Sequence, residues 1–281
     1  MHSVDFEAIT PKIGVRAKIT ASEILEEGVA DRVQEALDRH LVVVFPEIGL
    51  SDDQLVTLTE RLGAMEGLRF KADEDVARDP SVYRISLESD NRAVLDYVRG
   101  NEFWHMDGTA YETPGKGTLL KCEVPPASGG DTGFANLFAA WDALPETEKA
   151  RFEGLRVEHC MEAVMRKVHP DPTEKQLARW NAGFPRTPHP LVWTHEDGRK
   201  SFVIGSTAMD IVGLPHEEGV AMLDELLAWC TRDEFTYRHV WRKGDLVIFN
   251  NPALLHRSYP YDAASGRIMH RTTLKGTEAI A

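Results

Sequence analysis

Near its carboxyl terminus the chain carries a pattern that restricts how it can fold. Two apolar, β-rich runs, Leu246–Asn250 and Arg267–Leu274, predict a pair of strands joined by a loop. His256 follows the first of these strands. Side chains alternate along a strand with period two, so Arg267 and Arg271 are expected on the same face. Two guanidinium groups directed into one space predict anionic ligands.

A short upstream stretch, FWHMDG, places His105 and Asp107 two residues apart. In extended backbone this spacing puts both side chains on one face. With His256 they would supply two imidazoles and one carboxylate, a set that leaves metal positions open and is typical of non-haem iron(II) oxygenases. Long chains contain many His-x-Asp pairs, so the spacing alone indicates little. Support comes from Arg267, eleven residues after His256, and from the turn Gly129–Thr132.

Several motifs, in this order, resemble those of the TauD/TfdA family, the taurine and 2,4-dichlorophenoxyacetate type of 2-oxoglutarate-dependent dioxygenase. They are WHMDG, PPASGGDT, LVIFNN with LLHR, and GRIMHRTTLKG. An amino-terminal helix-strand-helix and the segment FVIGSTAMDIVGLPHEEG are similar too, so the resemblance covers most of the chain. It implies a double-stranded β-helix (jelly roll) core, which periodicity alone does not name.

The resemblance also implies roles for individual residues. His105, Asp107 and His256 would be the metal ligands and form the catalytic centre. Arg267 would bind the distal carboxylate of 2-oxoglutarate, since a planar guanidinium matches a carboxylate with two charge-assisted hydrogen bonds. Thr132 would donate its hydroxyl to the same carboxylate. Taken singly, each could instead be structural: ordinary buried histidines, a turn-capping aspartate, and a threonine that satisfies local backbone.

Two residues match substrate-contacting positions of the family. Arg271 stands where the family binds the acidic group of the primary substrate, and the competing interpretation is a structural ion pair. Asn101 precedes His105 by four residues, as a substrate-contacting asparagine does in the taurine branch, although its neighbours differ. Aromatic residues could line a pocket or fill the core; the candidates are Phe70, Tyr97, Phe103, Tyr111 and Phe202. The remaining histidines are interpreted as surface or packing residues, among them His40, His159, His169, His189, His195, His239 and His270.

The chemistry implied by the resemblance uses Fe(II), 2-oxoglutarate and O2, with release of succinate and CO2. The substrate would be a small organic anion such as a sulfonate, an aryloxyalkanoate or a related carboxylate, and hydroxylation is the expected outcome. Related halogenases have a small residue where Asp107 stands, so the carboxylate favours hydroxylation. Two alternatives stay open: the same chemistry used for desaturation or another biosynthetic oxidation, and a metal-binding jelly-roll protein or zinc hydrolase without oxygen chemistry.

The composition limits the classes of partner that the protein is expected to bind. A net charge of −13 argues against nucleic acid and against an anionic membrane surface. No apolar run approaches the roughly 20 residues of a membrane span. Three widely spaced cysteines, Cys122, Cys160 and Cys230, suggest neither a disulfide framework nor a zinc knuckle, so a reducing cytoplasm is expected. Members of the family are often dimeric or tetrameric, which leaves a homodimer and a homotetramer open.

A single domain over residues 1–281 is expected, because no repeat or linker divides the chain. The patterns predict a mainly β fold with flanking helices. Helices are predicted over Val29–His40, from Ser51 to before Gly63, over Thr173–Trp180 and over Pro215–Trp229; strands over Gly14–Ile19, Leu41–Phe45, Val82–Leu87, Gly117–Glu123, Ser201–Ile204 and Phe235–Trp241. The polar segment Leu68–Asn101 is expected to form a mobile flap, and it should determine specificity together with Val157–Pro190.

Overall fold

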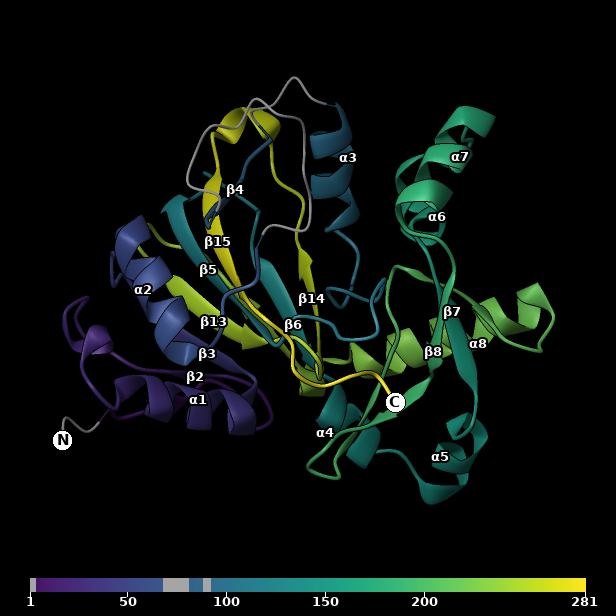
Figure 1. Cartoon of the computed structure of the whole chain (residues 1–281), viewed down its shortest axis with the longest axis horizontal. Coiled ribbons are helices and arrows are strands. Elements are labelled where there is room, and N and C mark those ends of the chain that lie inside the picture. The colour runs from purple at the N-terminus through teal and green to yellow at the C-terminus, as the bar shows by residue number, and fades with distance from the viewer. Residues whose placement is uncertain (1–3, 68–80, 88–91) are drawn as a thin grey trace.

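Two antiparallel-rich β-sheets form the centre of the structure, a computed structural model that describes residues 4–67, 81–87 and 92–281 (Figure 1). The larger sheet has seven strands, in spatial order β1 (Glu7–Ala8), β2 (Val15–Arg16), β3 (Val42–Phe45), β13 (Leu246–Asn250), β5 (Gly117–Val124), β15 (Ile268–Leu274) and β4 (Tyr83–Ile85). Every neighbouring pair is antiparallel except β2 and β3, which are parallel.

The smaller central sheet has three antiparallel strands, in the order β12 (Thr236–His239), β6 (Thr132–Asn136) and β14 (Leu254–Ser258). Its inner face packs against the larger sheet across a buried core. Phe134 and Leu254 from the smaller sheet belong to the same apolar cluster as Val44, Phe249 and Met269 from the larger one. Because side chains alternate along β14, His256 lies on the same inner face as Leu254.

Helices α1 (Val29–His40) and α2 (Asp52–Leu62) cover the outer face of the larger sheet (Figure 1). Both were predicted from the sequence. The predicted capping box at the start of α2 is present: the Ser51 hydroxyl accepts from the backbone of Gln54, whose side chain accepts from the Ser51 backbone. The helices bury Val33 and Leu58 against Phe45, so their apolar faces form a second layer of core.

The outer face of the smaller sheet is covered by further helices and two small sheets. Ala135 and Leu255 from this face pack into an apolar cluster with Trp141, Phe202 and Leu226. The remaining α-helices of the described residues are α3 (Arg92–Gly100), α4 (Leu137–Asp142), α5 (Glu146–Phe152), α6 (Met161–Val168), α7 (Glu174–Gly183) and α8 (His216–Cys230). The small sheets are β11 (Ala208–Ile211), β7 (Arg156–His159) and β8 (Thr187–Pro190), and β10 (Lys200–Phe202) with β9 (Val192–Thr194). Short 3₁₀ helices are η1 (Glu23–Leu25), η2 (Asp233–Phe235) and η3 (Ala263–Ser265).

The structure differs from the sequence-based prediction in one feature that matters for the site. The loop expected between the two downstream strands contains a third strand, β14, which belongs to the other sheet, so His256 lies within a strand and not after one. Strands β13 and β15 do not pair, because β5 lies between them. Half of the predicted flap, residues 68–80 and 88–91, lies outside the described residues, and its described half contains β4 and helix α3.

Among the described residues, no helix is long and apolar enough to span a membrane.

Candidate active site

The two histidines of the predicted metal site are joined through their backbones. The His105 N–H donates to the His256 carbonyl at 2.9 Å, and the His256 N–H donates to the His105 carbonyl at 2.9 Å. The rings lie 4.1 Å apart between centroids, and the His256 ring also contacts Phe249 at 4.8 Å. This bridge carries residues from distant parts of the sequence to one point between the two sheets.

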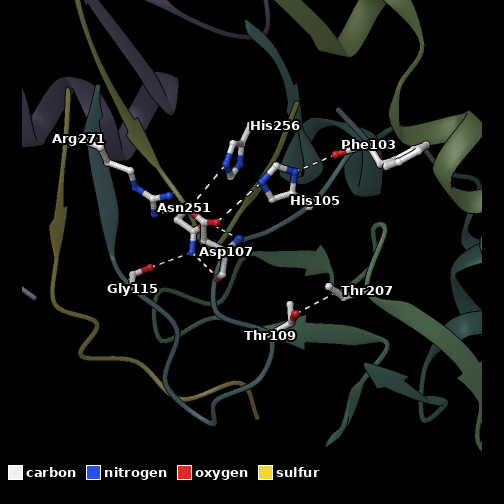
Figure 2. A network of polar contacts seen from close by, with 9 residues as sticks. All are labelled: Phe103, His105, Asp107, Thr109, Gly115, Thr207, Asn251, His256 and Arg271. Carbon is white, nitrogen blue, oxygen red and sulfur yellow. Dashed lines mark hydrogen bonds and ion pairs between the residues drawn. The ribbon is translucent and has the colours of Figure 1, made fainter. Parts of the chain in front are cut away.

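Asp107 completes the cluster (Figure 2). Its carboxylate oxygens lie 3.8 Å from His105 Nε2 and 3.7 Å from His256 Nε2. The three ligand atoms are all within 4.8 Å of one another. Metal bonds to imidazole nitrogen and carboxylate oxygen are about 2.0–2.2 Å long, so one ion placed among these atoms can reach all three. The sequence predicted this convergence, and the structure shows it.

The protonation states of the cluster suit a metal. His105 Nδ1 donates to the Phe103 carbonyl at 2.8 Å, so in the neutral ring Nε2 keeps its lone pair toward Asp107. Burial lowers the pKa of both His105 and His256, which keeps the imidazoles neutral. Burial alone would raise the pKa of Asp107, but the Arg271 guanidinium holds it below its ordinary value. Two neutral imidazoles and one carboxylate are the forms that bind a cation.

Asn251 supports the loop that carries Asp107, and the sequence analysis did not single it out. Its side-chain oxygen accepts from the Asp107 N–H at 2.9 Å. Its amide nitrogen donates to the carbonyls of Asp107 at 2.9 Å and of Gly115 at 3.0 Å (Figure 2). The residue is the second asparagine of the LVIFNN motif, so the signal was present in a motif already quoted.

Arg271 lies against the cluster of His105, Asp107 and His256. Its Nη2 is 2.5 Å from Asp107 Oδ2, and its side chain also hydrogen-bonds Tyr97. The ion pair weighed as the alternative for this residue therefore exists, and its partner is the carboxylate of the cluster. Arg271 Nε is buried and has no hydrogen-bond partner among the described residues, so the guanidinium keeps donor capacity.

Arg267 immediately precedes β15, Thr132 is the first residue of β6, and both are buried. The Gly129–Gly130 turn packs on Arg267: a Cβ at Gly130 would stand 3.0 Å from Arg267 Cδ, and Gly130 has a φ of +66°. The guanidinium lies 4.8 Å from the centre of the Tyr261 ring. Gly130 thus allows the turn to approach the arginine closely, and Gly129 allows it to approach the backbone of Pro260.

A cavity of about 270 Å³ opens beside the cluster. His105, Asp107 and Arg271 line it, as does Asn101. Both segments expected to determine specificity contribute apolar or aromatic side chains: Tyr83, Tyr97, Met161, Val164, Met165 and Phe184.

The aromatic residues named as candidates for the pocket have different locations in the structure. Tyr97 and Tyr111 line the cavity. Phe103 packs beside Val164 in a separate apolar cluster, Phe202 is fully buried core, and Phe70 lies outside the described residues. Among the histidines interpreted as surface or packing residues, four are buried and hydrogen-bonded: His159, His189, His195 and His239.

Comparison with known proteins identifies the family. The model of the family described as taurine catabolism dioxygenase TauD, TfdA family matches residues 5–273. The chain is 34% identical over 279 residues to the α-ketoglutarate-dependent 2,4-dichlorophenoxyacetate dioxygenase of Cupriavidus pinatubonensis, covering 95% of this chain and 94% of that one. It is 34% identical over 251 residues to the (S)-phenoxypropionate/α-ketoglutarate dioxygenase of Sphingobium herbicidovorans, covering 88% and 86%.

A solved structure supports the same assignment. The crystal structure of AAD-2 in complex with Mn(II) and N-oxalylglycine superposes with a TM-score of 0.82 at 27% identity, covering 99% of this chain and 100% of that one. The chain therefore belongs to the TauD/TfdA family and is an α-ketoglutarate-dependent dioxygenase, an oxidoreductase. The alternative of a metal-binding protein without oxygen chemistry is set aside.

Proposed function

We propose that this enzyme uses Fe(II), 2-oxoglutarate and O2 to hydroxylate a small organic anion, with His105, Asp107 and His256 as the metal ligands. The observation that carries the proposal is the convergence of three ligand atoms within 4.8 Å, from residues far apart in the sequence. Bound iron would supply the oxidation of 2-oxoglutarate to succinate and CO2, coupled to oxidation of the substrate. A facial set of two histidines and one carboxylate leaves the coordination positions that this requires.

The protein's own part is to hold the ligands and to keep water out. The His105–His256 backbone bridge and the Asn251 contacts fix the ligand positions before any metal binds. The hydrogen bond from His105 Nδ1 to Phe103 selects the tautomer that presents Nε2 to the metal.

The 2-oxoglutarate site is assigned to Arg267 and Thr132. Arg267 is 4% exposed, and its Nε has no partner among the described residues. A buried guanidinium with unsatisfied donors is costly, and the distal carboxylate of the diacid would repay that cost. Trp241 Nε1 donates to the Thr132 hydroxyl oxygen at 2.9 Å, which leaves the Thr132 proton to be donated to the same carboxylate.

The primary substrate is assigned to the cavity, with its acidic group at Arg271. Arg271 retains an unpartnered Nε beside its ion pair to Asp107, and Asn101 is on the cavity wall as a second polar contact. The rest of the wall is mostly apolar and aromatic, and it suits an organic body larger than a bare sulfonate. We therefore favour an aryloxyalkanoate or related carboxylate over a small sulfonate.

We also propose a domain organisation, a fold, a cellular compartment and an oligomeric state for the protein. One sheet contains strands from β1 to β15, which favours a single domain over residues 1–281. The two facing sheets, with helices outside, are interpreted as a double-stranded β-helix (jelly roll). Three free, buried cysteines are consistent with a cytoplasmic protein that binds neither nucleic acid nor membrane. A homodimer or homotetramer is proposed from the family and is testable by light scattering.

Oxygen uptake tests the function. Purified protein with Fe(II) and 2-oxoglutarate is screened against small carboxylates and sulfonates, with succinate measured in parallel. An aryloxyalkanoate should stimulate uptake and gain one oxygen by mass, or release a phenol after hydroxylation beside the ether oxygen. Loss of two hydrogens would favour the desaturation alternative. Absence of stimulated succinate with every compound would refute the substrate class.

A further inference from the structure

Thr109 and Thr207 stand on the cavity wall and belong to a buried hydrogen-bond chain that the mechanism above does not use (Figure 2). Their hydroxyl oxygens are 3.0 Å apart. Thr207 Oγ1 lies 2.8 Å from His159 Nδ1, and His159 Nε2 lies 3.2 Å from the Val203 carbonyl. His159 is fully buried, so its two ring nitrogens depend on these protein partners and not on water.

The direction of every proton in this chain follows from its last member. A carbonyl oxygen can only accept, so His159 Nε2 must donate to Val203. In the neutral ring Nδ1 then has only a lone pair, and it must accept from the Thr207 hydroxyl. The Thr207 proton is thereby used, so in the contact between the two threonines Thr109 must be the donor.

The neutral state of His159 is built into the fold. Burial and the neighbouring His189 lower the pKa of His159 to about 3. The His189 ring lies 5.8 Å away, and its Nε2 donates to the Thr109 carbonyl at 2.9 Å. One buried histidine thus orients the Thr207 hydroxyl, and the other fixes the backbone of Thr109.

Resting on the proposed function, we infer that Thr109 and Thr207 present only hydrogen-bond acceptors to the cavity and select substrates that carry an O–H or N–H group. Both protons are directed away from the ligand, so only oxygen lone pairs remain. Thr207 is the more accessible of the two, since it is partly exposed whereas Thr109 is 1% exposed. The cavity wall then offers two unlike polar contacts, Arg271 for an anion and Thr207 for a donor.

The substrate class that fits is a hydroxy- or amino-substituted small organic anion. A substituent that can only accept, such as an ether oxygen, would face the threonine lone pairs without a proton between them and would lose the hydrogen bonds of its own hydration shell. His159 acts here as a positioning residue, because it touches Thr207 and not the cavity.

The test compares matched ligands by equilibrium binding, so it does not depend on turnover. Calorimetry on Mn(II)- and 2-oxoglutarate-loaded protein measures Kd for 3- and 4-hydroxyphenoxyacetate and for the corresponding fluoro and methoxy compounds, one smaller and one larger than the hydroxyl compound. At one of the two ring positions, the hydroxyl compound should bind about tenfold more tightly than the fluoro and methoxy compounds substituted at that same position. Thr207→Val should reduce this ratio to near one, and Thr207→Ser should preserve it.

A second measurement is independent of any ligand. Nitrogen-15 NMR of the imidazole of His159 should show the Nε2–H tautomer with Nδ1 as an acceptor. The Nδ1–H tautomer would overturn the inference, as would equal binding of donor and acceptor compounds or a ratio unchanged in Thr207→Val. The proposed function fails differently: no phenoxyacetate would then stimulate succinate formation, whatever the tautomer.

Discussion

Replacing Arg267 by methionine should separate co-substrate binding from folding. The guanidinium is buried beside the Gly130 turn, and its Nε has no partner among the described residues. If it pairs with a 2-oxoglutarate carboxylate, its loss removes one side of a buried, hydrogen-bonded charge pair. Such truncations cost about 2–5 kcal/mol, which raises the Kd for 2-oxoglutarate about 30- to 5,000-fold.

The same substitution should weaken 2-oxoglutarate binding but should not destabilise the protein when 2-oxoglutarate is absent. Methionine fills similar space without a buried charge, so the free energy of unfolding should be unchanged or higher by up to about 2 kcal/mol. Calorimetric titration of 2-oxoglutarate into Mn(II)-loaded protein measures the first effect, and urea unfolding of the metal-free protein measures the second. Mn(II) affinity itself should stay within about threefold, because Arg267 is not a ligand.

Arg238 provides a matched control. It lies nearby, pairs with Asp131 at 2.6 Å and has a side chain that is 53% exposed. The Arg238 guanidinium is half exposed to water, although its partner Asp131 is buried, and Arg238 is not assigned to the 2-oxoglutarate site, so Arg238→Ala should change the Kd for 2-oxoglutarate less than about threefold. The assignment of Arg267 would be wrong if Arg267→Met bound 2-oxoglutarate as the wild type does, or if it lost the metal as well.

Three further changes test other parts of the site. Asn251→Ala should weaken Mn(II) binding about 10- to 100-fold in a calorimetric titration, because it releases the backbone of Asp107; unchanged affinity would remove its supporting role. Arg271→Ala should raise substrate KM and the ratio of succinate to hydroxylated product while sparing 2-oxoglutarate binding, and equal damage to both would contradict the division between the arginines. Burial would raise the pKa of Asp245, but hydrogen bonds from His239 and from backbone amides lower it. Its stabilising effect is therefore complete above pH of about 4 and is lost as the pH falls through the folded-state pKa, so Asp245→Asn should flatten urea-measured stability against pH on the acid side.

The convergence of His105, Asp107 and His256 was predictable because each part has a local signature. His105 and Asp107 are two residues apart in one motif, and His256 lies in another. Neither motif alone predicts that these residues meet in space. The resemblance of both motifs, in this order, to those of the family does predict it. Helix α1 and the Ser51 capping box were predictable for the same reason, since periodicity and cap chemistry are local.

Other features depend on contacts that no local pattern records. Strand β14 is only five residues long, and its histidine and arginine obscure the apolar pair Leu254–Leu255 that packs on both sides of the sheet. His159 and His189 were interpreted from the sequence as surface or packing residues; the fold buries both, and no local pattern indicates their contacts with Thr207 and Thr109. The Arg271–Asp107 contact was open in the same way, because a strand pattern gives the face of a side chain but not its partner.

The register of β15 bears on the proposal that Arg267 and Arg271 bind two different anions. Arg271 pairs with Leu120 of β5 and faces the cavity, whereas Arg267 lies just before the strand, beyond a register shift between Ile268 and Met269. Four extended residues span about 13 Å, far more than one small carboxylate can bridge. This separation is consistent with the proposal that the two arginines bind different groups. Because Arg271 already contacts Asp107, a substrate anion that pairs with Arg271 would lie next to the metal ligands, and a diacid held by Arg267 would approach them from the other end.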